Sequence, residues 1–329
     1  MIRSSNQELG EYDLIRQPDH IAKAWLVIDA SLPQYWDRFV ESGVPPDPAA
    51  QLATKFKTSS KKDPGEAGSF LAHLFEKAVH EYEKEAQKYR RFFDLEALEE
   101  YHDDPNAFKQ ALSRDVPIIA NTLRNRRTEL RDWQRSFRTA RAKDLLAVFE
   151  SVLDFIGEWQ EAHPVDQYMQ QEFESEPSGF GLDPLDDDKT MTIANVIGMG
   201  IKSIVLFHLD PERLPPRGRY GLYGLYFLSK MQDFQLPSGS SEFLMVNDIN
   251  PAPDGSMIMD HNYWYPYGLF SLYSLRVYNW IEARSQEAGV TLDPRLRFVY
   301  SERFFDAVCT QHQDDLRTMR AHERFEIPA

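Results

Sequence analysis

Four carboxylates and a histidine lie close together in one short stretch of the sequence, at Glu242, Asp248, Asp254, Asp260 and His261. Carboxylates beside an imidazole can bind Mg²⁺ or carry protons to and from a reacting group. That chemistry is typical of an enzyme that cuts a phosphodiester bond. Asp and Asn are also ordinary turn formers, so a plain connecting loop is the competing interpretation.

A second pair with possible chemistry lies near the end of the chain. Arg317 and His322 have four residues between them, a spacing that resembles the R-x4-H motif of the HEPN ribonucleases, in which paired copies cut RNA. Thr318 stands where that family often has Asn, and so short a motif also occurs by chance. The E-x-K element of many metal-dependent nucleases is missing from residues 242–261. A metal-dependent or HEPN-like phosphodiesterase or nuclease is therefore the alternative function, with Glu242, Asp248, Asp260, His261, Arg317 and His322 as its candidate residues.

Five arginines at helical spacing form what we call the arginine ridge: Arg124, Arg127, Arg131, Arg135 and Arg138. A guanidinium is a planar fork that suits phosphate or carboxylate groups. Like charges one helical turn apart repel each other, so we expect something to neutralise the ridge. The candidates are a partner and the chain's own acidic segment between Asp94 and Asp104.

The charge of the chain inverts directly after the ridge. Residues 114–143 contain nine Lys or Arg and three acids, whereas residues 144–188 contain thirteen acids and no Lys or Arg. A single helix is predicted over 128–162, and the inversion falls inside it. A helix dipole favours the opposite order, with acids first and bases last. Helix stability therefore does not account for the pattern, which leaves recognition of a charged partner or of another part of the same chain.

Two further charged features complete the predicted binding surface. Glu150, Asp154 and Glu158, which we call the acidic stripe, repeat every fourth residue. Such a stripe binds a basic partner or simply keeps the protein soluble, and together with the ridge it would allow copies to associate. Arg217 and Arg219 lie in a turn before a predicted helix, where free backbone N–H groups could hold an anion.

Other chemistry finds little support in the sequence. His73, Glu76 and His80 share a helix face but lack the second motif of a metal-binding bundle. There is no G-x-S-x-G motif, and Cys309 has no adjacent base. We therefore predict no metal and no cofactor, and we leave the catalytic residues of the preferred interpretation unknown.

Composition sets the broad class of the protein. The chain has 329 residues, of which 42% are hydrophobic, and this is enough for two domains with cores of their own. A net charge of −15 disfavours binding to bulk nucleic acid, except through a local basic surface. A single cysteine and the lack of an apolar leader or long apolar run indicate a cytoplasmic protein without a membrane anchor.

The elements that must position these residues are mostly helices. Apolar spacing predicts helices over 66–93, 128–162, 266–289 and 301–322, and short strands over 242–247 and 256–263. The first two helices are expected to pair as a long antiparallel, coiled-coil-like hairpin. We predict a mainly α protein with a helical bundle over 1–175, an acidic linker over 176–190, and a smaller aromatic-rich α+β domain over 191–329.

These features favour an intracellular interaction or regulatory protein. It would use the arginine ridge and the acidic stripe to engage a charged partner, which is a protein, a nucleic acid or its own copy. A third possibility is a small-molecule sensor, because the aromatic residues between Tyr263 and Tyr273 could line a pocket.

Overall fold

The computed structural model describes residues 11–42, 64–127, 130–165, 177–247 and 258–319. Its elements, in chain order, are α2 (Pro18–Ser42), α4 (Pro64–Phe92), α5 (Leu95–Glu99), α6 (Pro105–Asp115), α7 (Pro117–Arg124), α8 (Arg131–Thr139), α9 (Ala142–Ala162), η2 (Pro177–Phe180), α11 (Pro184–Asp187), η3 (Lys189–Met191), α12 (Met199–Leu209), α13 (Arg219–Leu228), β1 (Leu244–Asn247), β2 (Ile258–His261), α14 (Tyr267–Glu287), η4 (Pro294–Leu296), α15 (Arg297–Gln311) and α16 (Gln313–Met319).

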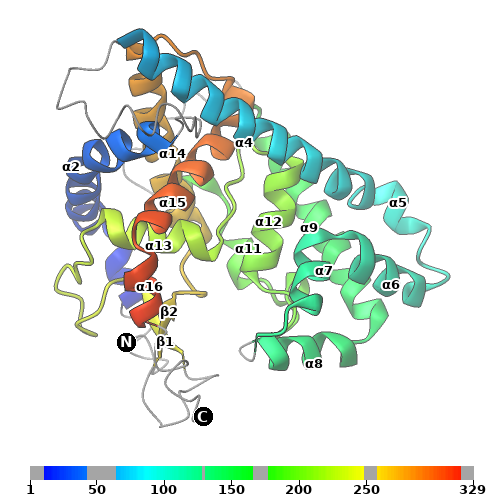
Figure 1. The fold of residues 1–329 in the computed structure, drawn as a ribbon. Coiled ribbons are helices and arrows are strands. Elements are labelled where there is room, and N and C mark those ends of the chain that lie inside the picture. The colour runs from blue at the N-terminus through cyan, green and yellow to red at the C-terminus, as the bar shows by residue number, and fades with distance from the viewer. Residues whose placement is uncertain (1–10, 43–63, 128–129, 166–176, 248–257, 320–329) are drawn as a thin grey trace, which may run out of the picture.

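The protein is mainly α, which confirms the predicted fold class. In Figure 1, α4 runs along one edge of the molecule and joins two groups of helices. One group contains α2, α13, α14, α15 and α16 with the β-hairpin, and the other contains α5 to α9, with α12 between the two. The principal contacts of α4 are with α12, α15 and α2, whereas those of α9 are with α6, η3 and α5. The antiparallel pairing expected between α4 and residues 128–162 is therefore not the main packing of either segment.

Two clusters of buried side chains form the core. The larger contains residues of α2, most of α4, the end of α9 and the helices that follow, with Phe39, Phe75 and Phe304 in contact through their rings. The smaller contains the end of α4 with α5 to α9, around Phe108 and Phe149. Residues 177–187 contribute Phe180, Leu182 and Leu185 to the larger cluster, so this part of the predicted linker is packed. The division of the chain into two domains stays a prediction.

The predicted single helix over 128–162 is wrong, because the chain leaves the helical conformation between α8 and α9. Ala140 and Arg141 have extended backbones, with ψ of 137° and 135°. Lys109 of α6 stabilises this break, because its Nζ donates to the carbonyl oxygens of Arg138 (2.8 Å) and Ala140 (2.6 Å). The charge inversion thus falls between two helices. Asp132 lies in the first turn of α8, Arg138 in its last turn, and Asp144 in the first turn of α9. This order suits each helix dipole at those ends, so the dipole argument for a partner no longer holds.

The predicted hairpin and the helix after it are confirmed. β1 and β2 pair antiparallel, with Met245 opposite Asp260. Pro266 caps the start of α14, and Gly289, at φ +77°, adopts the left-handed conformation that ends many helices. The predicted helix over 301–322 begins earlier, at Arg297, and is interrupted at His312, where α15 ends and α16 follows.

Candidate functional site

The β-hairpin brings three of the six predicted enzyme residues to one place. Glu242 lies just before β1, and Asp260 and His261 are the last two residues of β2. Because the strands pair in register, Leu244 lies opposite His261 at the same end of the hairpin. Glu242 is fully buried and Asp260 nearly so, and burial of this kind requires charged or hydrogen-bonding partners.

Asp260 and His261 form a hydrogen-bonded pair, which we call the dyad. His261 Nδ1 donates to Asp260 Oδ1 over 2.8 Å, and the Tyr223 hydroxyl of α13 donates to the same oxygen over 2.6 Å. Arg219, also on α13, lies 3.5 Å from Asp260 Oδ2. A carboxylate that holds Nδ1–H fixes the tautomer and leaves Nε2 as the acceptor, which is the arrangement of a general base.

The environment sets the protonation states of the dyad. Burial alone would raise the pKa of Asp260, but the hydrogen bonds from His261 and Tyr223 and the charge of Arg219 hold it well below its usual range. Burial lowers the pKa of the His261 imidazole, against the opposing effect of the Asp260 carboxylate. We therefore expect an ionised Asp260 and a neutral His261 at neutral pH. With His261 neutral, the lowered pKa of Asp260 rests on its hydrogen bonds and on Arg219 rather than on the charge of the imidazole.

Glu242 is the centre of a second set of polar contacts, which we call the Glu242 network. The Tyr265 hydroxyl donates to Glu242 Oε1 over 2.7 Å, and His20 Nε2 contacts Oε2. Asn262 Nδ2 donates to the Glu242 backbone oxygen over 2.9 Å. His20 belongs to α2, so the network joins the N-terminal helix to the hairpin across 222 residues of sequence. These contacts use both carboxylate oxygens of Glu242, which indicates a role in holding the hairpin in place.

Of the two arginines predicted to hold an anion, Arg217 is engaged by the protein itself. Its side chain is buried, and it donates to the backbone oxygens of Tyr263 (2.9 Å) and Tyr265. Arg217 therefore secures the chain between β2 and α14. Arg219 is only partly buried and approaches the dyad. It is the arginine of the predicted pair that lies at a candidate reaction centre.

The remaining predicted enzyme residues are Asp248, Arg317 and His322. Asp248 and His322 lie outside the described residues. Arg317 is on α16, which packs near β2, but its Nη1 donates to Asp314 of the same helix over 2.8 Å. The sequence gives no sign of Tyr223 or His20 as partners, because they come from α13 and α2, whereas Tyr265 belongs to the aromatic stretch that directly follows β2.

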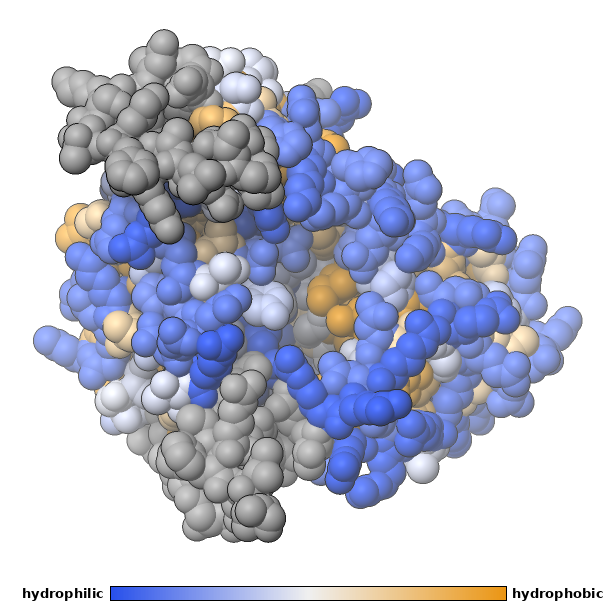
Figure 2. All heavy atoms as spheres, in the orientation of Figure 1, coloured by the Kyte–Doolittle hydropathy of each residue, from blue (hydrophilic) through white to orange (hydrophobic). Residues whose placement is uncertain are grey.

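The arginine ridge lies on two short helices rather than on the face of one. Arg124 is the last residue of α7, Arg127 follows it, and Arg131, Arg135 and Arg138 are on α8. Gln134 of α8 holds the two parts together, because its Nε2 donates to the backbone oxygens of Thr122 (2.8 Å) and Asn125 (2.7 Å). The ridge residues are all exposed. The surface over α7 and α8, at the lower right of Figure 2, is largely hydrophilic.

The chain itself neutralises the ridge only in part. Arg135 pairs with Asp132 on the same helix over 3.3 Å, and both side chains are more than half exposed. Arg124, Arg131 and Arg138 have no ion pair with any residue in the described parts of the chain. In the acidic segment expected to compensate them, Asp94 caps α5 and Asp104 caps α6. No acid of that segment forms an ion pair with these three arginines among the described residues.

The acidic stripe lies along α9. Glu150 Oε1 is 2.5 Å from His102 Nε2, whereas Asp154 and Glu158 are exposed and form no ion pair among the described residues. The stripe is thus less compensated toward the C-terminal end of α9.

The described ranges contain neither a cluster of metal-binding side chains nor a membrane-spanning helix. No three His, Cys, Asp or Glu side chains converge there as they would around a metal ion. None of the helices in those ranges has the length and apolar character needed to cross a membrane. No family model matches the sequence, and neither a curated protein nor a solved structure is similar to it.

Proposed function

We propose that this chain is an interaction protein that binds an acidic protein partner through the arginine ridge. The observation that carries the proposal is the exposure of Arg124, Arg131 and Arg138 without an ion pair among the described residues. Repulsion between neighbouring guanidinium groups is relieved when carboxylates approach them. The net charge of −15 repels any extended polyanion at longer range. A nucleic-acid backbone carries a charge at every phosphate, whereas a protein can present a few carboxylates locally, so an acidic patch on a protein is favoured over a polyphosphate. A second copy of the chain qualifies as this partner, because it presents Asp154 and Glu158.

Charge reversal on α8 tests this proposal. In the variant Arg131→Glu, Arg135→Glu, Arg138→Glu, binding of a fluorescein-labelled oligoglutamate peptide should weaken at least about tenfold at low salt, because three attractive contacts become repulsive. Fluorescence anisotropy measures peptide binding, and sedimentation velocity measures self-association across a salt series. Binding by the unchanged protein should itself weaken as salt rises.

A matched control separates the ridge from net charge. The variant Lys84→Glu, Lys88→Glu, Arg91→Glu changes three exposed residues of α4 by the same total charge. Equal losses in both variants, or no loss in the α8 variant, would rule out the ridge as the binding surface. Tighter binding of an oligonucleotide than of the peptide at equal charge would replace the protein partner with a nucleic acid.

A second candidate function, metal-independent cleavage of a phosphodiester, is supported by the dyad. His261 Nε2 is left to accept a proton, and the His261 side chain is 19% exposed. In this reaction Nε2 would take the proton from an attacking hydroxyl or water, and Arg219 would lie near the negative phosphate. General-base catalysis contributes about 10²- to 10⁴-fold, so His261→Ala should lose at least about a hundredfold of any such activity.

Labelled RNA and DNA oligonucleotides test the second candidate, incubated with EDTA and separately with Mg²⁺ or Mn²⁺. His73→Ala, which changes an exposed histidine of α4, is the matched control. No cleavage under any condition, or equal cleavage by His261→Ala and the control, would exclude the dyad. Loss of activity in His322→Ala alone would move the site to the end of the chain.

A further inference from the structure

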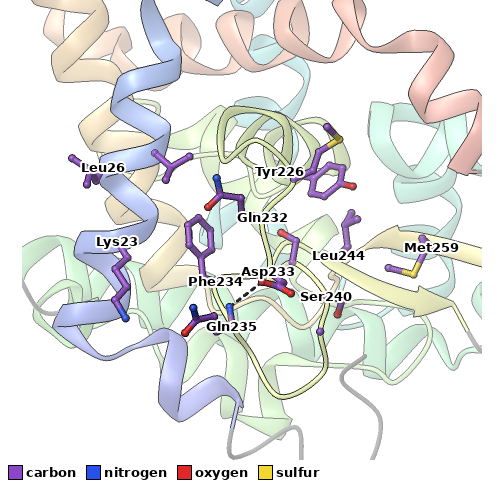
Figure 3. Close-up of a pocket in the computed structure, with 14 residues that line it drawn as sticks. Lys23, Leu26, Tyr226, Gln232, Asp233, Phe234, Gln235, Ser240, Leu244 and Met259 are labelled. Atoms are coloured by element: carbon purple, nitrogen blue, oxygen red, sulfur yellow. Dashed lines mark hydrogen bonds between the residues drawn. The ribbon is translucent and has the colours of Figure 1, made fainter.

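A cavity of about 800 Å³ lies apart from the ridge and the dyad. α2 forms one side, with Lys23, Leu26 and Val27. The two strands of the hairpin and the end of α13 form the other side. Figure 3 shows Phe234, Gln232 and Asp233 between these two sides, on the loop that follows α13. Cavities of this size are typical of sites for small organic molecules.

The walls of the cavity combine apolar and polar side chains, and the apolar ones can adapt to a ligand. Phe234, Tyr226, Leu244 and Met259 contribute rings and flexible aliphatic or thioether groups. Leu26 is 71% exposed, so a large apolar side chain stands in water at the cavity. An apolar ligand would remove this surface from water, which is favourable. Methionine suits such a site because its unbranched side chain fits ligands of different shape.

The loop beside the cavity adopts an unusual backbone. Two turns follow each other, closed by hydrogen bonds from Gln232 N to Ser229 O (3.2 Å) and from Leu236 N to Asp233 O (2.9 Å). The two central residues of each turn have positive φ, between 48° and 64°, although none is glycine: they are Lys230, Met231, Phe234 and Gln235. Such strain is retained where the surroundings need a particular side chain in place, and it is frequent at ligand sites. Here it directs Met231, Phe234 and Gln235 to the cavity.

The charged groups of the cavity indicate the charge of the ligand. Asp233 Oδ1 already accepts a hydrogen bond from Gln235 N over 2.9 Å (Figure 3). Lys23, by contrast, forms no ion pair with any residue of the described segments. Asp233 keeps its negative charge on the loop, so the single ammonium group on α2 suits a ligand with no more than one negative charge, and the net charge of −15 disfavours ligands with more. Gln232 and Gln235 add neutral amides that can bond to a carboxylate or sulfonate.

We propose that this cavity binds a small organic monoanion with a flat apolar body, of the class of aromatic carboxylates. Phe234, Leu26 and the hairpin residues cover the ring system, and Lys23 binds the anionic group. The proposal does not depend on the arginine ridge or on the dyad. A failure of the cavity proposal would leave the other two untouched, and the reverse also holds.

Two fluorescent probes with the same rings test this site. 8-Anilino-1-naphthalenesulfonate carries the negative charge, and N-phenyl-1-naphthylamine lacks it. We expect saturable binding of the sulfonate to the folded protein. Lys23→Glu should weaken the sulfonate roughly tenfold and the neutral amine less than about twofold. Leu26→Asp, a change at an exposed position that leaves the core intact, should weaken both probes.

Leu95→Asp and Lys84→Glu are the matched controls, because they make the same changes at exposed positions of α5 and α4. Neither should alter the affinity for the probes. No saturable sulfonate binding, or equal binding by wild type and Leu26→Asp, overturns the site. A Lys23→Glu variant that weakens both probes equally, or neither, overturns the assignment of an anion.

Discussion

Replacing Glu242 with alanine is expected to lower the free energy of unfolding by about 3 to 5 kcal/mol, because two buried side chains lose their hydrogen-bond partner at a cost of about 1 to 3 kcal/mol each. Glu242 is fully buried and contacts His20 and Tyr265 through its two carboxylate oxygens. Without the carboxylate, the Tyr265 hydroxyl and the His20 imidazole lose their partner inside the protein. Chemical denaturation monitored by circular dichroism measures the change.

The location of these contacts explains why the effect should be so large. His20 is on α2 and Tyr265 lies between β2 and α14, so the Glu242 network joins three segments that are distant in sequence. The Tyr273 hydroxyl is also buried there and has no hydrogen-bond partner among the described residues. Burial together with the Glu242 charge raises the pKa of Tyr273 well above the ordinary value. Water that enters to solvate the orphaned groups would separate α2 from the hairpin.

Three further variants make this prediction specific. Glu83→Ala removes another ion-paired glutamate, whose partner Arg90 is 3.1 Å away but whose side chain is 41% exposed, and it should cost less than about 1 kcal/mol. Glu242→Gln keeps an acceptor for Tyr265 and should cost less than alanine. In the His20→Ala background, Glu242→Ala should cost at least about 1 kcal/mol less than it does alone. Additive losses, or a loss below about 1 kcal/mol in Glu242→Ala, would show that the network does not stabilise the fold.

Local signals in the sequence were sufficient to predict the ends of a helix or strand where those ends depend on neighbouring residues. Pro266 and Gly289 delimit α14 because proline favours a helix start and glycine adopts positive φ at little cost. The hairpin is likewise readable, since two short apolar runs flank a loop rich in turn formers. In both cases the residues that determine the structure lie within the element itself.

The break between α8 and α9 could not be predicted from the residues around it. Ala140 and Arg141 are good helix formers, and neither proline nor glycine stands near them. The break is stabilised by Lys109, whose ammonium group binds two backbone oxygens from a distance of about thirty residues in sequence. Its Nζ also lies 5.6 Å from the centre of the Phe137 ring. A tertiary contact of this kind overrides helix propensity and leaves no local pattern.

The same distinction between local signals and contacts across the fold applies to the candidate sites. The arginine ridge and the dyad each consist of residues that are close in sequence, so the sequence alone can group them. Tyr223 and His20 were missed, since only the fold places α13 against the dyad and α2 against Glu242. A single sequence holds no signal for contacts across that separation.

Acid should destabilise the protein through His208. This imidazole is buried on α12, where it stacks on Tyr89 with ring centres 4.0 Å apart, and its Nδ1 donates to the Ile204 backbone oxygen over 2.7 Å. Burial lowers the pKa of His208 from 6.5 to about 4, with a smaller contribution from the charge of Arg90. In the unfolded chain, His208 therefore binds a proton near pH 6.5, whereas in the folded protein it binds one only near pH 4.

The sign of the effect follows from this difference. Where the unfolded state binds more protons, the free energy of unfolding falls as the pH falls. The contribution of His208 is therefore lost between about pH 6.5 and pH 4, and it amounts to about 3 kcal/mol over the whole range. At pH 4.5 most of the loss, about 2.5 kcal/mol, should already be present.

The variant His208→Phe isolates this contribution, because phenylalanine cannot bind a proton and preserves a flat ring between Tyr89 and Tyr82, whose ring is stacked on the other side with its centre 5.5 Å from that of His208. Denaturation curves for the wild type and the variant at several pH values between 7.5 and 4.5 give the two pH profiles. The difference in stability between them should shift by about 2.5 kcal/mol in favour of the variant as the pH falls. His208→Gln, which keeps a hydrogen-bond donor, should show the same shift even if it is less stable at every pH. Parallel profiles for the wild type and both variants would mean that His208 accepts its proton in the folded protein as readily as in the unfolded chain, and that the stack on Tyr89 opens to water.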